Sequence, residues 1–265
     1  MPGPRFTDIR RFDTIDSTNR YLLGEARAGA PEGVVAVAGH QTAGRGRLGR
    51  HWEAPAGANL LVSILLRPDL PAGQRYLASA VVALAAAAAV EDLADLRLGV
   101  KWPNDLLAPD GRKVAGVLAE GDLTAPPPTS APGVHVHPPI VVGIGVNVNW
   151  PADDGDLPEE LVGTATSLRR LAGHPFDPSA VLDSLLDALE PRLDALGTPS
   201  GRSLQADELR RRCVTLGTAV RIELADSRFE GQAVDVTPEG HLMVETDAGP
   251  RTVVAGDVVH VRPRA

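Results

Sequence analysis

The sequence predicts a protein of two parts, in which a larger region that mixes helices and strands precedes a small all-β domain. The chain has 265 residues, which at ~150 residues per domain suggests about two domains. Apolar runs of both helix and strand length occur over the first part of the chain. From residue 216 onwards only short alternating runs follow, separated by turn residues. We therefore expect domains at residues 1–215 and 216–265.

Apolar periodicity and breaker residues predict the elements of the larger region. Ser17 and Thr18 precede a helical pattern that ends at Gly29. Short apolar runs such as VVAVA and LLVSILL are typical of buried strands, whereas the long alanine-rich run is typical of a buried helix. We expect helices at residues 19–27, 74–93, 167–171, 178–196 and 204–213, and strands at residues 34–38, 60–66, 98–102, 114–120 and 140–148.

The end of the chain and one internal segment differ from the rest in their residue pattern. Five short alternating segments indicate a small barrel or sandwich, at residues 220–224, 229–236, 241–245, 251–254 and 257–262. The Pro-rich segment 124–139 joins two predicted strands and should be an extended or disordered loop.

Composition and charge argue against several classes of protein. The net charge is −8, whereas proteins that bind nucleic acids are usually basic, so we expect no nucleic-acid partner. One cysteine, Cys213, excludes an intramolecular disulfide framework and a multi-cysteine zinc site. The longest uncharged apolar run, residues 77–90, is shorter than the ~20 residues of a membrane span. The start has no apolar region of a signal peptide, and we expect a cytoplasmic protein without membrane contact.

Glycines and arginines alternate in the segment 44–50, GRGRLGR. Glycine lets the backbone approach a ligand closely, and arginine presents a planar fork of donors to phosphate or carboxylate. A flexible basic linker or an RNA-binding tract would have a similar composition. The position between two predicted buried strands favours a loop that binds an anion.

Three more motifs lie at the ends of predicted strands. KWPND at residues 101–105 and GRKVAGVL at residues 111–118 bring two lysines and an Asn-Asp pair close together in the sequence. GIGVNVN at residues 143–149 has two glycines within a strand, which indicates close approach by a ligand or by another part of the chain. A solvated turn lysine and a bulged core strand are the alternatives for the isolated motifs.

These motifs, together with STN at residues 17–19 and QTAGRGR at residues 41–47, resemble the biotin protein ligase (biotin–[acetyl-CoA-carboxylase] ligase) family over nearly the whole chain. The resemblance implies an α+β fold. Its parts would be a mixed β-sheet catalytic domain of the biotin/lipoate ligase (class II synthetase-like) type and a small C-terminal SH3-like β-barrel. Only 16 residues precede Ser17, so we expect the short form without a DNA-binding domain.

The resemblance also implies a reaction. The biotin carboxylate attacks the α-phosphorus of ATP to give biotinyl-5′-AMP, and a lysine of the biotin carboxyl carrier protein domain of acyl-CoA carboxylase then displaces AMP. Two anions must meet in the first step, so fixed cations and Mg²⁺ are needed to offset their charge. ATP and Mg²⁺ are the expected cofactors, biotin is the second substrate, and the oligomeric state, including a homodimer, stays open.

The resemblance assigns roles to individual residues. Those expected to bind biotin are Ser17, Thr18, Asn19, Gln41, Gly44, Arg45, Lys113 and Gly116. Those expected to bind ATP are Arg47, Arg50, Trp52, Asn104, Lys113 and Asn147. The expected catalytic residues are Lys113, Arg47, Asp105 and Lys101. Lys113 should lie between the biotin carboxylate and the α-phosphate, and Asp105 should help to place Mg²⁺ or the incoming lysine, with no direct metal ligand assigned.

Two other functions are compatible with parts of this pattern. A lipoate–protein ligase would share the overall fold, but the combination of GRGRLGR and KWPND favours biotin. A non-catalytic biotin-binding sensor would not need to activate phosphorus, so Lys113 and the arginines argue for an enzyme.

Overall fold

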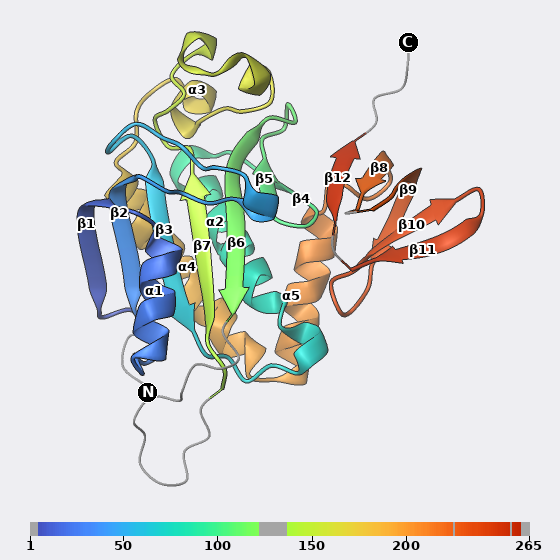
Figure 1. Ribbon diagram of the computed structural model, residues 1–265, viewed down its shortest axis with the longest axis horizontal. Helices are drawn as coiled ribbons and strands as arrows, with labels where there is room; N and C mark the ends of the chain where they lie inside the picture. Colours follow the sequence, from blue (N-terminus) through green and yellow to red (C-terminus); the bar gives the residue numbers. More distant parts are fainter. Residues whose placement is uncertain (1–4, 122–136, 225, 255, 261–265) are drawn as a thin grey trace, which may run out of the picture.

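The computed structural model describes residues 5–121, 137–224, 226–254 and 256–260. A seven-stranded sheet forms the centre of the larger region, in the order β1-β2-β3-β7-β6-β5-β4 (Figure 1). β1 and β2 are parallel and all other neighbours are antiparallel, so the sheet is mixed, as predicted. Its strands are β1 (Ile9–Ile15), β2 (Val35–Gln41), β3 (Leu60–Leu66), β4 (Gly99–Lys101), β5 (Asp105–Leu107), β6 (Lys113–Gly121) and β7 (Ile140–Val146).

Helices cover both faces of this sheet (Figure 1). α1 (Thr18–Arg27) packs on one face, and α2 (Leu77–Ala94) and α4 (Pro178–Leu196) pack on the other. Alternate residues of a strand point to opposite faces. Leu65 therefore joins the apolar cluster under α1, whereas Leu66 joins the main core with α2 and α4. α3 (Leu168–Ala172) and α5 (Pro199–Arg212) complete the larger region.

The segment Ala72–Ala94, which includes α2, is long and apolar enough to cross a membrane by length and composition alone. In the 18-residue stretch of that segment that meets this test, 67% of the residues are nevertheless buried inside the protein. Its side chains pack against the sheet and α4 in the main core. Such burial is typical of the central helix of a globular domain.

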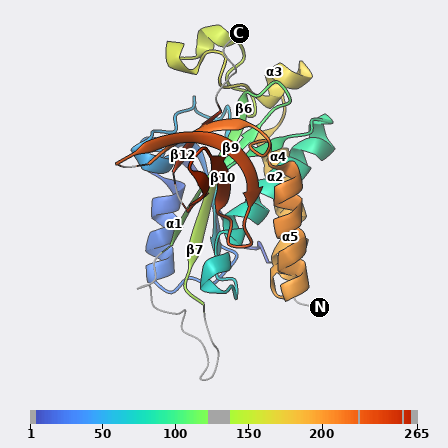
Figure 2. The ribbon, with the colours of Figure 1, turned by 90° about the vertical axis from the view of Figure 1, so that its right-hand side faces the viewer.

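The C-terminal strands form a second, antiparallel sheet in the order β11-β10-β9-β8-β12. Figure 2 shows these strands in front of the main sheet, with α5 beside them. The ring of Trp102, which follows β4, belongs to their apolar core, and its Nε1 donates to the carbonyl oxygen of Gly240 at 2.9 Å. This small β-domain fits the predicted SH3-like type, although among the described residues no pairing of β11 with β12 closes the sheet into a barrel. Its strands are β8 (Ala219–Glu223), β9 (Arg228–Val236), β10 (Leu242–Thr246), β11 (Gly249–Val253) and β12 (Asp257–His260).

The observed elements differ from the expected ones at three places. β1 was not predicted, and the strand expected at 98–102 is only the first half of a hairpin of β4 and β5. α5 begins at Pro199, earlier than expected, because the Thr198 side chain caps it by accepting from the backbone N–H of Gly201 at 3.0 Å. Most of the predicted Pro-rich loop, residues 124–136, lies outside the described residues.

Candidate functional site

A cavity of about 830 Å³ opens on the face of the main sheet that carries α1. Strands β3, β6 and β7 contribute its floor, and the N-terminus of α1, the segment between β2 and β3 and the β4–β5 hairpin contribute its walls. Val258, Val259 and His260 of β12 also line it. The fold therefore brings segments from both ends of the chain to one cavity.

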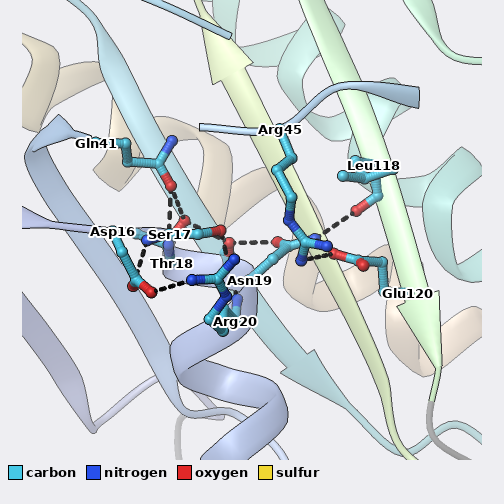
Figure 3. Close-up of polar contacts among 10 residues, drawn as sticks. Asp16, Ser17, Thr18, Asn19, Arg20, Gln41, Arg45, Leu118 and Glu120 are labelled. Carbon is cyan, nitrogen blue, oxygen red and sulfur yellow. Dashed lines mark hydrogen bonds and ion pairs between the residues drawn. The ribbon is translucent and has the colours of Figure 1, made fainter. Parts of the chain in front are cut away.

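One end of the cavity is polar and lies at the N-terminus of α1 (Figure 3). Ser17 is the N-cap residue of α1, and Thr18 and Asn19 follow it, all three buried. Thr18 donates from its backbone N and from Oγ1 to Gln41 Oε1, at 2.8 and 3.0 Å. Ser63 Oγ of β3 lies 2.7 Å from Thr18 Oγ1 and 2.6 Å from Asn19 Oδ1.

This cluster has more close oxygen–oxygen contacts than hydroxyl hydrogens. Three contacts join Gln41, Thr18, Ser63 and Asn19 in a row. Thr18 and Ser63 each carry one hydroxyl hydrogen. The amide oxygens of Gln41 and Asn19 at the two ends of the row carry none and can only accept, so two hydrogens serve three contacts. The cluster is therefore rich in acceptors and suits a ligand that brings N–H donors.

Lys113 and Asp105 form the ionic part of the cavity. Lys113 Nζ lies 2.7 Å from Asp105 Oδ1 and 5.3 Å from the centre of the Trp52 ring. The backbone of Lys113 is held on both sides, since its N donates to Thr164 O at 2.8 Å and its O accepts from Thr166 N at 2.9 Å. The strand start is thus fixed, while both side chains stay partly exposed to the cavity, 32% for Lys113 and 22% for Asp105.

The glycines of GIGVNVN make room for side chains of the site. A Cβ at Gly143 would overlap the amide oxygen of Asn19, and a Cβ at Gly145 would overlap the indole of Trp52. Gly116 on the adjacent strand also faces this indole, which would lie 3.2 Å from its Cβ. The close approach that the sequence indicates at this strand is therefore made by neighbouring side chains.

Arg47 links the segment between β2 and β3 to two other parts of the protein. Its Nη1 donates to Asn104 Oδ1 and its Nη2 donates to the carbonyl oxygen of Gly256, both at 3.2 Å. Asn104 in turn donates from Nδ2 to Val117 O of β6 at 2.7 Å. Arg47 thus spans the cavity edge from the β4–β5 hairpin to the C-terminal strands.

The side-chain amide of Asn147 is engaged within the protein. Its Nδ2 donates to Thr166 O at 3.0 Å, and its Oδ1 accepts from Asn59 Nδ2 at 3.3 Å. Asn147 lines the cavity, but these two bonds hold the segments around it together.

Basic side chains outnumber acidic ones in the cavity, although the chain as a whole carries a net charge of −8. Burial, and to a smaller extent the charge of Lys101, lowers the pKa of His260, so this imidazole loses its proton more readily than an exposed one. A locally positive cavity attracts anionic ligands. The basic residues are Arg45, Arg47, Arg50, Lys101 and Lys113, and the acidic ones are Glu53, Asp105 and Asp110.

Nearly all the residues predicted for the site share this cavity. Gly44 is the exception: its carbonyl oxygen accepts from Trp52 N at 3.0 Å, and a Cβ there would overlap the Trp52 carbonyl oxygen. Gly44 therefore allows the chain to fold back on itself. The predicted residues that line the cavity are Ser17, Thr18, Asn19, Gln41, Arg45, Arg47, Arg50, Trp52, Lys101, Asn104, Asp105, Lys113, Gly116 and Asn147.

Sequence reasoning missed two residues that line the cavity, Ser63 and His260, and one that supports it, Glu120. Ser63 is the one polar residue in the run LLVSILL. A polar side chain in a predicted buried strand could have indicated that it belongs to the site. Glu120 follows the cavity floor along β6 and binds Asn19 and Arg45. His260 lies on the last strand, far from the other motifs in sequence, and no local pattern marks it.

Comparison with known proteins identifies the class and then the family. Residues 11–127 match the Biotin/lipoate A/B protein ligase family, and residues 215–261 match the Biotin protein ligase C terminal domain. Fold and cavity thus define a protein of the biotin and lipoate ligase class. The chain is 38% identical to the biotin–[acetyl-CoA-carboxylase] ligase of Mycobacterium tuberculosis, over 96% of this chain and 90% of that protein. The chain belongs to the biotin protein ligase family.

Two further relatives support this membership. The chain is 32% identical to the bifunctional ligase/repressor BirA of Bacillus spizizenii, over 93% of this chain and 72% of that longer protein. The structure of biotin protein ligase from Aquifex aeolicus in complex with biotin and ATP is similar, with a TM-score of 0.78, 28% identity and coverage of 97% of this chain and 100% of that one. The predicted resemblance and the predicted fold class are confirmed.

Proposed function

We propose that the protein activates biotin with ATP as biotinyl-5′-AMP and transfers the biotinyl group to a lysine of a biotin carboxyl carrier protein domain of an acyl-CoA carboxylase. One observation carries this proposal. A single cavity has an acceptor-rich cluster around Thr18 and Gln41 at one end, and Lys113 among other cations at the other. A ligand with N–H groups at its head and a carboxylate at its tail matches both ends.

Biotin has this distribution of groups. Its ureido ring brings two N–H donors to the oxygens of Thr18, Ser63 and Gln41, and its valerate chain carries the carboxylate towards Lys113. Trp52 supplies an aromatic face beside that ammonium group, and its buried Nε1 has no hydrogen-bond partner among the described residues. The face of the indole can therefore contact a ligand, whereas its N–H group is covered within the protein.

In the first step a carboxylate oxygen of biotin attacks the α-phosphorus of ATP, the new C–O–P bond forms, and the bond to pyrophosphate breaks. Lys113 offsets the negative charge that gathers between the two reactants. The ammonium group contacts Asp105 at 2.7 Å, and substrate anions compete with Asp105 for it. Arg47, Arg50 and Lys101 bind the phosphates, while orientation by the cavity removes much of the entropic cost of the encounter.

Mg²⁺ would be bound together with the nucleotide. The described residues contain no group of three His, Cys, Asp or Glu side chains that could hold a metal ion. Mg²⁺ on substrate phosphates needs only one or two protein carboxylates, and Asp105 in the cavity fits that need. When bound, the ion neutralises phosphate charge.

In the second step the neutral amine of the carrier lysine attacks the carbonyl carbon of the mixed anhydride, an amide bond forms, the bond from that carbon to the AMP oxygen breaks, and the proton that the amine loses passes to solvent as AMP leaves. Asp105 becomes available when Lys113 turns to the substrate anions, and its carboxylate can then place the incoming amine. A closed cavity protects the anhydride from water until the lysine arrives.

We also propose the cytoplasm as the place of action, where the single, buried thiol of Cys213 stays reduced. The negative net charge supports a function without nucleic acid. β1 forms one edge of the main sheet. The edge of a second copy of the chain can pair with it, so the proposal includes a homodimer.

The test is to incubate the protein with biotin, MgATP and a carrier domain, and to measure the intact mass of the carrier. We expect one biotinyl group on one lysine, and no product when lipoate replaces biotin. A protein that binds biotin without releasing pyrophosphate would be a sensor, and one that attaches lipoate instead would be a lipoate ligase. Either result would overturn the proposal.

A further inference from the structure

Glu120 binds two predicted biotin-site residues with one carboxylate oxygen (Figure 3). It lies near the end of β6 and is 24% exposed. Its Oε2 accepts from Asn19 Nδ2 at 2.8 Å and from Arg45 Nη2 at 2.7 Å. Asn19 comes from the first turn of α1, and Arg45 comes from the basic segment between β2 and β3, so Glu120 joins the two walls of the cavity.

The first contact sets the orientation of the Asn19 amide. Its Nδ2 donates to Glu120 and to Leu118 O at 3.2 Å, and both of these partners can only accept. The amide oxygen must therefore face Ser63, which it contacts at 2.6 Å. The acceptor row around Thr18 is thus supported by Leu118 O and by a carboxylate, Glu120, that lies outside the cavity lining.

The second contact sets the position of the basic segment. Arg45 is 37% exposed and pairs with Glu120 across the edge of the cavity. The arginines of the segment 44–50 repel one another. The carboxylate of Glu120 supplies a negative charge beside Arg45, at the start of that segment. A charged acceptor makes both hydrogen bonds stronger than a neutral one would.

We propose that Glu120 is a positioning residue for biotin, acting through Asn19 and Arg45 and not through the reacting atoms. This inference rests on the proposed function, because it assigns the acceptor row to biotin. It predicts that changes at Glu120 weaken the binding of biotin while the chemistry at Lys113 and the affinity for MgATP stay the same.

The experiment measures biotin-dependent ATP–pyrophosphate exchange in variants of the full chain. Glu120→Met removes both acceptor contacts at similar side-chain volume, and we expect KM for biotin to rise about tenfold, as for a lost hydrogen bond to a charged group. Glu120→Gln keeps an acceptor oxygen but loses the charge, so its KM should lie between those of Glu120→Met and the unmodified protein. KM for MgATP and kcat should not change.

A double-mutant cycle tests whether Glu120 acts through its partner. In an Arg45→Met background, Glu120→Met should raise KM for biotin by a smaller factor than it does alone. If Glu120→Met fails to fold, Glu120→Gln must still raise KM for biotin, and by a smaller factor in the Arg45→Met background. The matched control is Glu25→Met, which removes an ion pair of 2.6 Å with Arg10, with both side chains 30% exposed, from the other end of α1.

The outcomes separate this inference from the proposed function. If the unmodified protein shows no exchange with biotin, the proposed function fails. If it does show exchange but folded Glu120 variants keep the original KM for biotin, or lose kcat and MgATP affinity to the same extent, the positioning role of Glu120 is wrong. An equal rise of KM in Glu25→Met would also overturn it, because the effect would then be a general loosening of α1.

Discussion

Replacing Lys113 with Met removes the ammonium group from the cavity and keeps the apolar stem beside Trp52. In the structure this ammonium holds a carboxylate at 2.7 Å, so it can contact a substrate anion just as closely. A unit charge ~4 Å from a developing negative charge is worth about 4 kcal/mol at an effective dielectric constant of about 20. Each ~1.4 kcal/mol is a factor of ten in rate, so we expect adenylate formation to slow by about 10²–10³.

The same substitution should hardly change stability. The two side chains of the pair are 32% and 22% exposed, and a partly exposed ion pair contributes about 1 kcal/mol at most. We therefore expect a large loss of rate in a protein whose free energy of unfolding is nearly unchanged. Pyrophosphate release with biotin and MgATP measures the first quantity, and denaturant unfolding measures the second.

Arg112→Met is the matched control for this prediction. Arg112 is the neighbour of Lys113 in the chain and pairs with Asp110 at the same distance, 2.7 Å. The substitution Arg112→Met removes one cation but leaves the ammonium group of Lys113 that contacts Asp105. Adenylate formation at the normal rate in Lys113→Met, or an equal loss in Arg112→Met, would refute the reasoning.

Three more predictions follow from individual contacts. Arg47→Gly breaks the bonds to Asn104 and Gly256, so biotinyl-5′-AMP should escape into solution, where chromatography would detect it; full retention would contradict this. Hydrogen bonds from Arg192 lower the pKa of Glu208 below its ordinary value of 4.5, so this group stabilises the fold above that pH and the contribution is lost as pH falls through the lowered pKa; Glu208→Gln should lose less stability on acidification than the unmodified protein in urea unfolding. Burial raises the pKa of the Cys213 thiol, so iodoacetamide should react with it only after denaturation, and rapid labelling of the native protein would disagree.

The motifs were predictable from sequence because each one lies next to a strand that apolar runs mark clearly. β1 was not, because its sequence IRRFDTI interrupts the apolar pattern with charges. An edge strand needs only one neighbour and can keep charged side chains in solvent. Its existence depends on pairing with β2, which no local pattern records.

The side chains that support the site were harder to find than those that line it. Glu120 shares no motif with Asn19 and Arg45, and the three meet only because β6, α1 and the segment after β2 converge. Trp102 presents the opposite case, since it lies within a predicted motif and also packs into the core of the C-terminal strands. One motif thus joins the cavity to the second sheet, and sequence spacing alone does not distinguish these two roles.

The reaction proposed for this cavity is tested most directly by isotope exchange between pyrophosphate and ATP in the absence of any carrier. Label should enter ATP only when biotin is present, because the reversal of adenylate formation needs the carboxylate beside Lys113. Exchange that proceeds equally well without biotin, or no exchange by the folded protein with biotin and MgATP, would contradict the account.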